Sequence, residues 1–409
     1  MPIDVRLLAP FLVLAAGEAP AATGRAEPVG DHGHDGGWLR FSPHLSAAVA
    51  LGGSSSEKNL GLVAGGHAPV DDGFNLQAIE LGAVLQFGDR LSVQAIHNAF
   101  WDPFDHWDGE WEEAYAEIGL AGDVTLRGGQ FFAPFGLENS LHLHERSFIE
   151  PPISMIRLLG EDGLIVQGGE LAWKLPAAGE RWTLKLGYGQ AREHQHGEGR
   201  ELRREAYFEA LEGGHAEEEE EHHSHGVAGG GGVYDAEMAY LEDGFLFGRL
   251  EARPGLAVID TAGVSFAAGR NGFGRTTWTA GADLGGGGEL AGRPLEWQAE
   301  TYFRGVEAVD ASGADGSFDE FGWLVGCGWE VADHWTLASR LEWASGNRMS
   351  GSERRWRFAT NISRLLHPGA GTDLTARLQY SYDRLGGYAD EHGLWLQLVW
   401  NFGGEGHRH

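Results

Sequence analysis

The sequence predicts an all-β fold, a transmembrane antiparallel β-barrel of about 16 strands. Many segments alternate apolar with polar or small side chains, which is typical of strands with lipid on one side and water on the other. Aromatic side chains recur near the ends of these segments, where a barrel meets the lipid headgroups. After the N-terminus no stretch approaches the roughly 20 apolar residues of a spanning helix, so helical insertion is excluded.

The clearest alternating segment lies close to the C-terminus. One of its faces is apolar and the other is mixed, because Leu394, Leu396, Leu398, Trp400 and Phe402 alternate with Trp395, Gln397, Val399 and Asn401. This aromatic-ended segment resembles the terminal targeting strand of bacterial outer-membrane barrels, and a short tail, residues 403–409, follows it. We therefore expect the protein in the bacterial outer membrane.

The same alternation locates the other strands and their connections. The predicted strands are 38–51, 73–88, 90–101, 111–121, 124–133, 163–175, 180–190, 234–252, 256–268, 275–285, 294–305, 319–330, 334–345, 354–366, 372–383 and 392–402. Connections after even strands are short and those after odd strands are generally longer, as in barrels with short periplasmic turns and long external loops. A Gly-rich turn at 285–294 and a short loop at 270–274 depart from this rule.

The N-terminal residues have the features of a secretory signal. Arg6 precedes an apolar run that ends at the small-x-small site Ala19-Pro20-Ala21, so we assign residues 1–21 as a signal peptide. Residues 22–37 form a periplasmic segment that contains His32 and His34 between two aspartates, and the barrel occupies 38–402. These two histidines are candidate ligands for ions that have crossed the membrane, and an N-terminal segment without this function is the alternative.

Charge and cysteine content limit the function further. The net charge of −30 excludes nucleic acid as a partner and favours cations. Cys327 is the only cysteine and alternates with Val325 and Trp329, which indicates a small apolar residue on the lipid face. The sequence has neither a phosphate-binding P-loop nor a nucleophile elbow, so we expect no enzyme activity and no obligatory cofactor.

One short motif carries a family resemblance. The run Gly128-Gly129-Gln130-Phe131-Phe132-Ala133-Pro134-Phe135-Gly136-Leu137-Glu138 resembles a signature of porins similar to the phosphate-selective porin O and P group. The resemblance implies a passive sixteen-stranded channel, often a homotrimer, whose long third external loop, here 134–162, folds into the lumen and narrows the pore. It also implies anion selectivity through a ladder of inward arginines and lysines.

The inward face of the predicted strands carries charges of both signs. The basic residues assigned to the pore are Arg127, Lys174, Lys185, Arg304, Arg340, Arg355, Arg357 and Arg377. Acidic residues share these faces, namely Glu80, Glu117, Glu170, Glu296, Glu300 and Glu342. Inward charges of opposite sign that pair across strands would keep the lumen wet without selecting phosphate.

Two histidine-containing loops are candidate metal sites. The external loop 192–226 offers imidazoles and carboxylates, the ligands that Zn²⁺ and related ions prefer, at His194, His196, His215, Glu217, Glu218, Glu219, Glu220, Glu221, His222, His223 and His225. A solvated polar loop without metal is the alternative. In the third loop, His142, His144 and Glu145 would lie at the constriction and form a transient relay site, or else pack against the wall with their histidines hydrogen-bonded.

Together these patterns predict a passive outer-membrane channel for small solutes. We expect divalent metal ions, zinc above all, to be concentrated by the loop 192–226 and bound only transiently. The alternatives are an anion (phosphate)-selective porin with an inert acidic loop, and a surface protein that sequesters metal and uses the barrel as an anchor. About sixteen residues separate the signal from the first strand, too few for the plug domain of an energy-coupled receptor.

Overall fold

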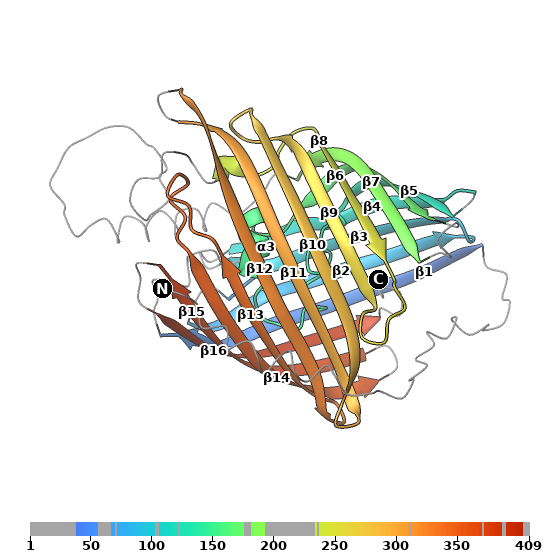
Figure 1. The fold of residues 1–409 in the computed structure, drawn as a ribbon. Helices are drawn as coiled ribbons and strands as arrows, with labels where there is room; N and C mark the ends of the chain where they lie inside the picture. The colour runs from blue at the N-terminus through green and yellow to red at the C-terminus, as the bar shows by residue number, and fades with distance from the viewer. Residues whose placement is uncertain are drawn as a thin grey trace.

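The protein is a closed β-barrel in a computed structural model (Figure 1). The structure describes residues 38–55, 67–69, 72–102, 106–121, 123–175, 181–192, 234, 237–310, 313–369, 372–386 and 390–403. Within these residues, sixteen antiparallel strands follow one another around the ring in chain order. The predicted fold class is confirmed.

The strands agree with the predicted segments to within a few residues in most cases. Their bounds are β1 (Leu39–Ser54), β2 (Gly73–Phe87), β3 (Leu91–Asp102), β4 (His106–Gly119), β5 (Val124–Phe132), β6 (Ile165–Lys174), β7 (Trp182–Ala191), β8 (Phe245–Ala252), β9 (Thr261–Arg270), β10 (Thr276–Leu290), β11 (Arg293–Val309), β12 (Asp315–Ala332), β13 (Trp335–Ala344), β14 (Arg355–Gly369), β15 (Thr372–Leu385) and β16 (Glu391–Gly403). A short helix, α3 (Ile153–Leu159), and a single 3₁₀ turn, η3 (Glu237–Ala239), complete the assigned elements.

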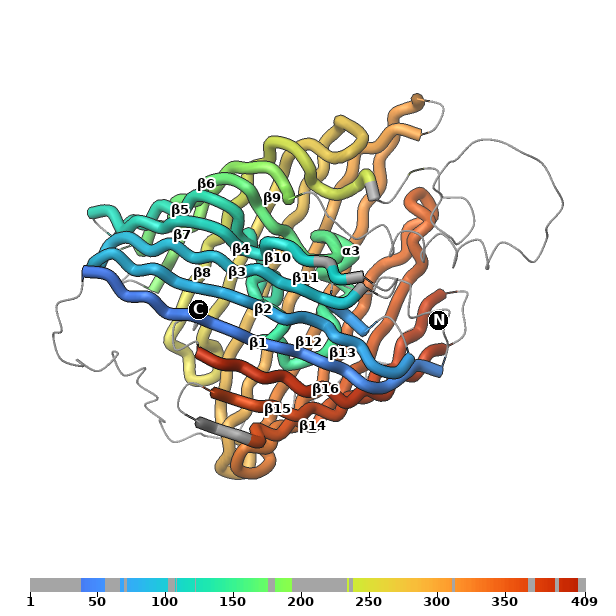
Figure 2. Tube along the Cα trace, turned by 180° about the vertical axis from the view of Figure 1, so that it is seen from behind, coloured from blue at the N-terminus to red at the C-terminus, as the bar shows by residue number. Residues whose placement is uncertain are grey.

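The first and last strands close the barrel. β1 pairs with β2 on one side and with β16 on the other, with Val49 opposite Leu398 (Figure 2). Closure gives each of the described strands two hydrogen-bonded neighbours, so the sheet has no free edge strand.

The two faces of the wall differ as the alternation predicts. On β16 the side chains of Leu394 and Trp400 are 56% and 38% exposed, while Trp395 and Gln397, which point inward, are 2% and 0% exposed. Exposed leucines, valines, phenylalanines and tryptophans recur in the same phase on the other strands. The outer surface is therefore the apolar band that a membrane barrel presents to lipid.

Four predicted boundaries are wrong by five residues or more. β4 begins at His106 instead of 111, β9 begins at Thr261 instead of 256, and the other two errors concern β10 and β8. Residues 285–290 continue β10 through four consecutive glycines, and the turn is confined to Ala291 and Gly292, whose φ angles are 55° and 74°. Glycine gave no alternating signal, so the strand could not be distinguished from a loop. The strand predicted from residue 234 begins only at Phe245, because 237–239 form the turn η3.

Within the described part of the chain, no helix is long and apolar enough to cross a membrane.

The connection between β5 and β6, residues 133–164, is called the third loop below. It lies within the ring of strands, and both views show its helix α3 enclosed by the barrel (Figure 1; Figure 2). Its side chains Phe135, Leu143, Ile149 and Met155 are at most 2% exposed. The inward course of this loop is confirmed.

Candidate functional site

The family-like motif turns the chain from the wall into the lumen. Phe135 stacks on the Tyr302 ring of β11, with ring centroids 6.0 Å apart and an interplanar angle of 11°. Gly136 has a φ of 70°, which glycine adopts at little cost, and this turn lets the next two backbone N–H groups, of Leu137 and Glu138, donate to the Glu300 carboxylate, each at 3.0 Å. The motif thus fixes the start of the third loop.

The far end of the third loop is fixed to the opposite wall. The N–H of Ile153, the first residue of α3, donates to Glu342 Oε2 at 2.6 Å, so a wall carboxylate caps the helix. Further wall side chains bond to the loop: Gln379 accepts from Ile149 N, and Arg340, Asn361 and Arg377 donate to the carbonyls of Glu150, Ser147 and Arg146. The loop therefore spans the lumen from β5 to β13–β15.

Between these anchors the third loop meets the wall of β1–β4 in a cluster of imidazoles and carboxylates. We call His44, Glu80, Glu112, Glu113, His142 and His144 the histidine–carboxylate cluster. His44 Nε2 and His144 Nδ1 each lie 2.9 Å from the same oxygen, Glu80 Oε1. Their rings are tilted against one another with centroids 4.7 Å apart, and His142 stacks on His144 at 5.9 Å.

His142 is held between two glutamates of β4. Its Nδ1 lies 2.8 Å from Glu112 Oε2 and its Nε2 lies 3.3 Å from Glu113 Oε2. Asn98 and Gln94 of β3 donate to the same carboxylates. Burial opposes a charge on the imidazole, but the two carboxylates outweigh it and raise the pKa of His142 well above its ordinary value.

A β-bulge brings the two glutamates together. In strict alternation Glu112 and Glu113 would face opposite sides of the wall, yet both are 4% exposed. The register between β3 and β4 shifts at Ile96 and His97, which leaves Glu112 without an opposite residue. Both carboxylates therefore point into the lumen.

A second group of polar contacts ties His67, which precedes β2 in the chain, and the third loop to β4. His67 Nε2 lies 3.5 Å from Glu110 Oε1, and Arg192 bridges Glu110 and Asp162 with N to O distances of 3.0 and 2.8 Å. His67 is buried, which lowers its pKa, but the hydrogen bond and the charge of Glu110 raise the pKa above its ordinary value.

The predicted arginines on the opposite wall face the lumen, and most of them are paired. Arg304 forms an ion pair with Glu320, and Arg340 lies 2.6 Å from Glu342. Arg249, which was not among the predicted pore residues, pairs with Asp283. A single carboxylate, Asp383, accepts from both Arg355 and Arg357, at 2.7 and 2.9 Å. Carboxylates of the same strand or of nearby strands thus offset much of the basic ladder.

The remaining predicted pore residues occupy different surroundings. Arg127 lies 3.2 Å from Glu117 and over the Tyr115 ring. Glu145 accepts from the backbone N–H of His142 at 3.1 Å, so it shapes the loop rather than the cluster. Glu300 is bonded to the third loop, while Glu296 is exposed and Lys185 partly buried on the inward face of their strands.

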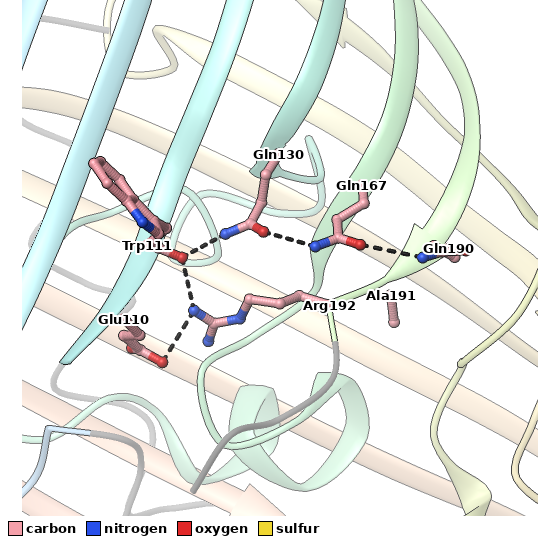
Figure 3. Close-up of a pocket in the computed structure, with 7 residues that line it drawn as sticks. All are labelled: Glu110, Trp111, Gln130, Gln167, Gln190, Ala191 and Arg192. Carbon is pink, nitrogen blue, oxygen red and sulfur yellow. Dashed lines mark hydrogen bonds and ion pairs between the residues drawn. The ribbon is translucent and has the colours of Figure 1, made fainter. Parts of the chain in front are cut away.

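A pocket of about 390 Å³ opens on the outside of the wall near the ends of β4–β7. Figure 3 shows its amide ladder, in which Gln190 donates to Gln167, Gln167 to Gln130, and Gln130 to the Trp111 carbonyl. Gln167 and Gln190 alternate in phase with the exposed Leu171 and Tyr188. The glutamine ladder therefore lies on the outer face, while the lining residues Glu110 and Arg192 are joined to Asp162 of the third loop.

The histidine-rich candidates lie outside the described residues. This holds for His32 and His34, for the signal 1–21, and for the loop residues His194, His196, His215, Glu217, Glu218, Glu219, Glu220, Glu221, His222, His223 and His225.

Sequence reasoning missed four members or neighbours of the cluster. His44 lies in a predicted strand, in phase with inward Ser46 and Ala48, so alternation alone marked it as inward. Glu113 is likewise in phase with inward Glu117. Glu112 and His67 gave no such signal, because the first depends on the bulge and the second lies in a loop.

Comparisons with known proteins support the fold. No family model matches the sequence, and no similar sequence was found among curated proteins. Three solved structures cover this chain almost fully at low identity. The anion-selective porin from Comamonas acidovorans is 11% identical, with 89% of this chain and 100% of that chain covered and a TM-score of 0.53.

The outer membrane channel DcaP of Acinetobacter baumannii is 10% identical, with 90% and 97% covered and a TM-score of 0.53. OmpT of Vibrio cholerae, in its trimer form, is 11% identical, with 89% and 99% covered and a TM-score of 0.50. The chain therefore has the fold of the bacterial outer-membrane porins.

Proposed function

We propose that the protein is a passive channel of the bacterial outer membrane that admits small cations, including divalent metal ions such as Zn²⁺. The porin fold and the apolar outer face support the location, because the barrel can bury that face only in lipid. The passage beside the third loop would carry the ions.

The observation that carries this proposal is the distribution of charge around the third loop. On the β1–β4 side, the carboxylates of Glu80, Glu112 and Glu113 lie beside the imidazoles of the histidine–carboxylate cluster. On the opposite side, the ladder of arginines is largely offset by wall carboxylates. Carboxylates and imidazoles are the groups that attract divalent transition metals.

The external loop 192–226 would raise the local metal concentration at the mouth of the channel. Its histidines and its unbroken acidic run, Glu217 to Glu221, are suited to weak and broad binding of Zn²⁺. Weak binding at the entrance favours conduction, because an ion that is held tightly cannot proceed. An inert acidic loop remains the alternative for this segment.

Zinc influx into proteoliposomes tests the proposal. Vesicles that contain the purified protein and a trapped zinc-sensitive dye should brighten on addition of Zn²⁺ much faster than protein-free vesicles. Equal rates would contradict a channel for divalent metal. They would favour the alternative in which the barrel only anchors a metal-sequestering surface loop.

A charge-reversal pair tests whether the lumen attracts the cation. Glu296→Lys places a positive charge on the inward face of β11, whereas Glu307→Lys makes the same change on its outward face. Glu296→Lys should slow zinc influx several-fold while Glu307→Lys leaves it near wild type, because only the first charge lies in the ion path. Equal effects would argue against a cation path along this wall.

An anion channel is the second candidate function. Arg377 donates to Ser363, Gln397 and the Arg146 carbonyl, and Arg157 to the Ser345 carbonyl, so neither is bonded to a carboxylate within the described residues. Basic groups of this kind would attract anions. The similar fold of the anion-selective porin from Comamonas acidovorans also supports the anion-channel candidate. The sign of the reversal potential in a salt gradient distinguishes the two candidates.

We also propose that the protein assembles as a homotrimer in the membrane. OmpT of Vibrio cholerae, which has a similar fold, has been solved in a trimer form. Crosslinking of membranes followed by electrophoresis should give a band of three chains, and a ladder that ends at the single chain would contradict the proposal.

A further inference from the structure

We infer that His44, Glu80 and His144 form a binding site for one divalent transition-metal ion, and that this ion fastens the third loop to the barrel wall. The inference concerns a resident ion and goes beyond the proposed passage of ions through the channel. His44 lies on β1, Glu80 on β2 and His144 in the third loop, so one ion would join two strands and the loop.

The geometry of the three ligand atoms is the first observation. His44 Nε2 and His144 Nδ1 both lie 2.9 Å from Glu80 Oε1, and all three ligand atoms lie within 4.8 Å of one another. In a tetrahedral zinc site with metal bonds near 2.0 to 2.1 Å, neighbouring ligand atoms are about 3.3 Å apart. Separations of this size need only small movements of two rings.

The second observation is an unsatisfied carboxylate oxygen. Glu80 is 0% exposed, and its Oε2 has no hydrogen-bond partner among the described residues. A buried carboxylate oxygen without a donor is costly, and a bound cation would satisfy it. Glu80, Glu112 and His142 also have ligand atoms within 4.8 Å of one another, so further metal-binding groups lie beside the Glu80 carboxylate.

The rings of the site are closely packed. His44, His144 and His142 follow one another at centroid distances of 4.7 and 5.9 Å. One divalent ion bound by His44 and His144 would supply the positive charge that the buried Glu80 carboxylate needs.

The surroundings hold the ligands in place. His142 stacks on His144 and is itself fixed by Glu112, whose carboxylate accepts from Asn98 at 2.9 Å. Groups that orient metal ligands in this way commonly contribute 10- to 100-fold to affinity. The chemistry of two imidazoles and one carboxylate suits Zn²⁺, Co²⁺ or Ni²⁺.

Metal retention by the folded full chain tests the inference. The purified protein is stripped with a chelator, incubated with Zn²⁺, dialysed and analysed for bound metal, and Co²⁺ absorption reports the coordination. The variants are His44→Gln, Glu80→Gln and His144→Gln. His97→Gln is the matched control, because His97 lies on the outward face of β3 against Trp111.

We expect wild type and His97→Gln to retain one more tightly bound ion per chain than the three site variants. Loss of one ligand should weaken affinity by more than the roughly 100-fold of a supporting residue. Any binding by the external loop is common to all five proteins and cancels in the difference. Equal retention in all five proteins would overturn the inference.

A second measurement tests the role of the ion in holding the loop. Chelation should increase current fluctuations of single wild-type channels and leave those of His144→Gln unchanged, since that variant already lacks the tie.

The gel mobility of unheated samples shows whether each barrel is folded. His144→Gln changes only the loop, so this variant remains informative even if His44→Gln or Glu80→Gln does not fold. Chelator-insensitive wild-type currents would refute the proposed tie. Metal retention does not depend on which ions the channel conducts, so its failure would leave the proposed function intact.

Discussion

His142 Nδ1, in the third loop, lies 2.8 Å from Glu112 Oε2 on β4, thirty residues earlier in the chain. Both groups are buried, and the bulge in β4 is what turns Glu112 toward the loop. The bulge in β4 thus determines where the third loop contacts this side of the barrel wall.

Glu112→Gln should destabilise the folded barrel. Removal of one partner of a buried ion pair typically costs about 3 to 5 kcal/mol, because the other charge stays buried without compensation. Denaturant titration followed by gel mobility measures the free energy of unfolding.

The matched control is Glu117→Gln, on the same strand. Glu117 pairs with Arg127, and its side chain is 35% exposed. A pair that is partly open to solvent contributes about 0 to 1 kcal/mol, so this variant should unfold close to wild type. Equal loss of stability in the two variants would show that the cluster does not stabilise the third loop.

Asp383→Asn should shift ion selectivity toward anions. Asp383 accepts from both Arg355 and Arg357, so its neutralisation leaves two guanidinium groups without their shared carboxylate. The reversal potential in a KCl gradient reports the shift.

Asp390→Asn removes the same charge from an exposed position next to β16, where Asp390 accepts from Tyr382. It should leave the reversal potential close to wild type. A shift of similar size in both variants would mean that overall charge, and not the lumen wall, determines selectivity.

The contact of His67 with Glu110 should make stability depend on pH. Because the folded-state pKa of His67 is raised, its contribution to stability is complete below the unfolded value near 6.5 and is lost as the pH rises through the folded value. The difference in free energy of unfolding between wild type and His67→Gln should therefore be larger at pH 5.5 than at pH 9. A difference that does not change with pH would exclude this assignment.

The alternation of side chains predicted most of the barrel, and the exceptions have physical causes. On β16 every second residue from Leu394 to Phe402 is exposed, and lipid and lumen impose this period on each strand. The four glycines of 285–288 have no side chains and so carry no phase, which hid the end of β10. The segment 237–239 alternates by chance but forms a 3₁₀ turn.

The candidate site could be predicted only in part. His142 and His144 were placed at the constriction because the family-like motif marks the inward loop. Their partners required a register that the sequence does not reveal, since the bulge at Glu112 changes which residues of β4 face the lumen. The wall carboxylate that pairs with Arg304 likewise follows from strand register, whereas Glu342 lies two residues from Arg340 on the same strand.

Deletion of 193–226, which keeps Arg192 and its bridge from Glu110 to Asp162, should lower zinc accumulation by cells at scarce metal and leave single-channel conductance largely intact. The loop would act on the ion concentration at the entrance and not on the passage beside the third loop. Cellular zinc, measured during growth in chelated medium, tests this role. Unchanged accumulation would favour an inert loop.

The sign of the reversal potential tests the central claim most directly. The purified protein is inserted into a planar bilayer that separates concentrated from dilute KCl, and the voltage of zero current is recorded before and after Zn²⁺ is added to the dilute side. We expect ohmic current steps and a zero-current voltage whose sign shows that K⁺ crosses more readily than Cl⁻. Zn²⁺ on the dilute side should then shift this voltage in the direction expected for zinc entry from that side. A voltage of the opposite sign would show an anion channel and would contradict the account, as would a bilayer without current steps.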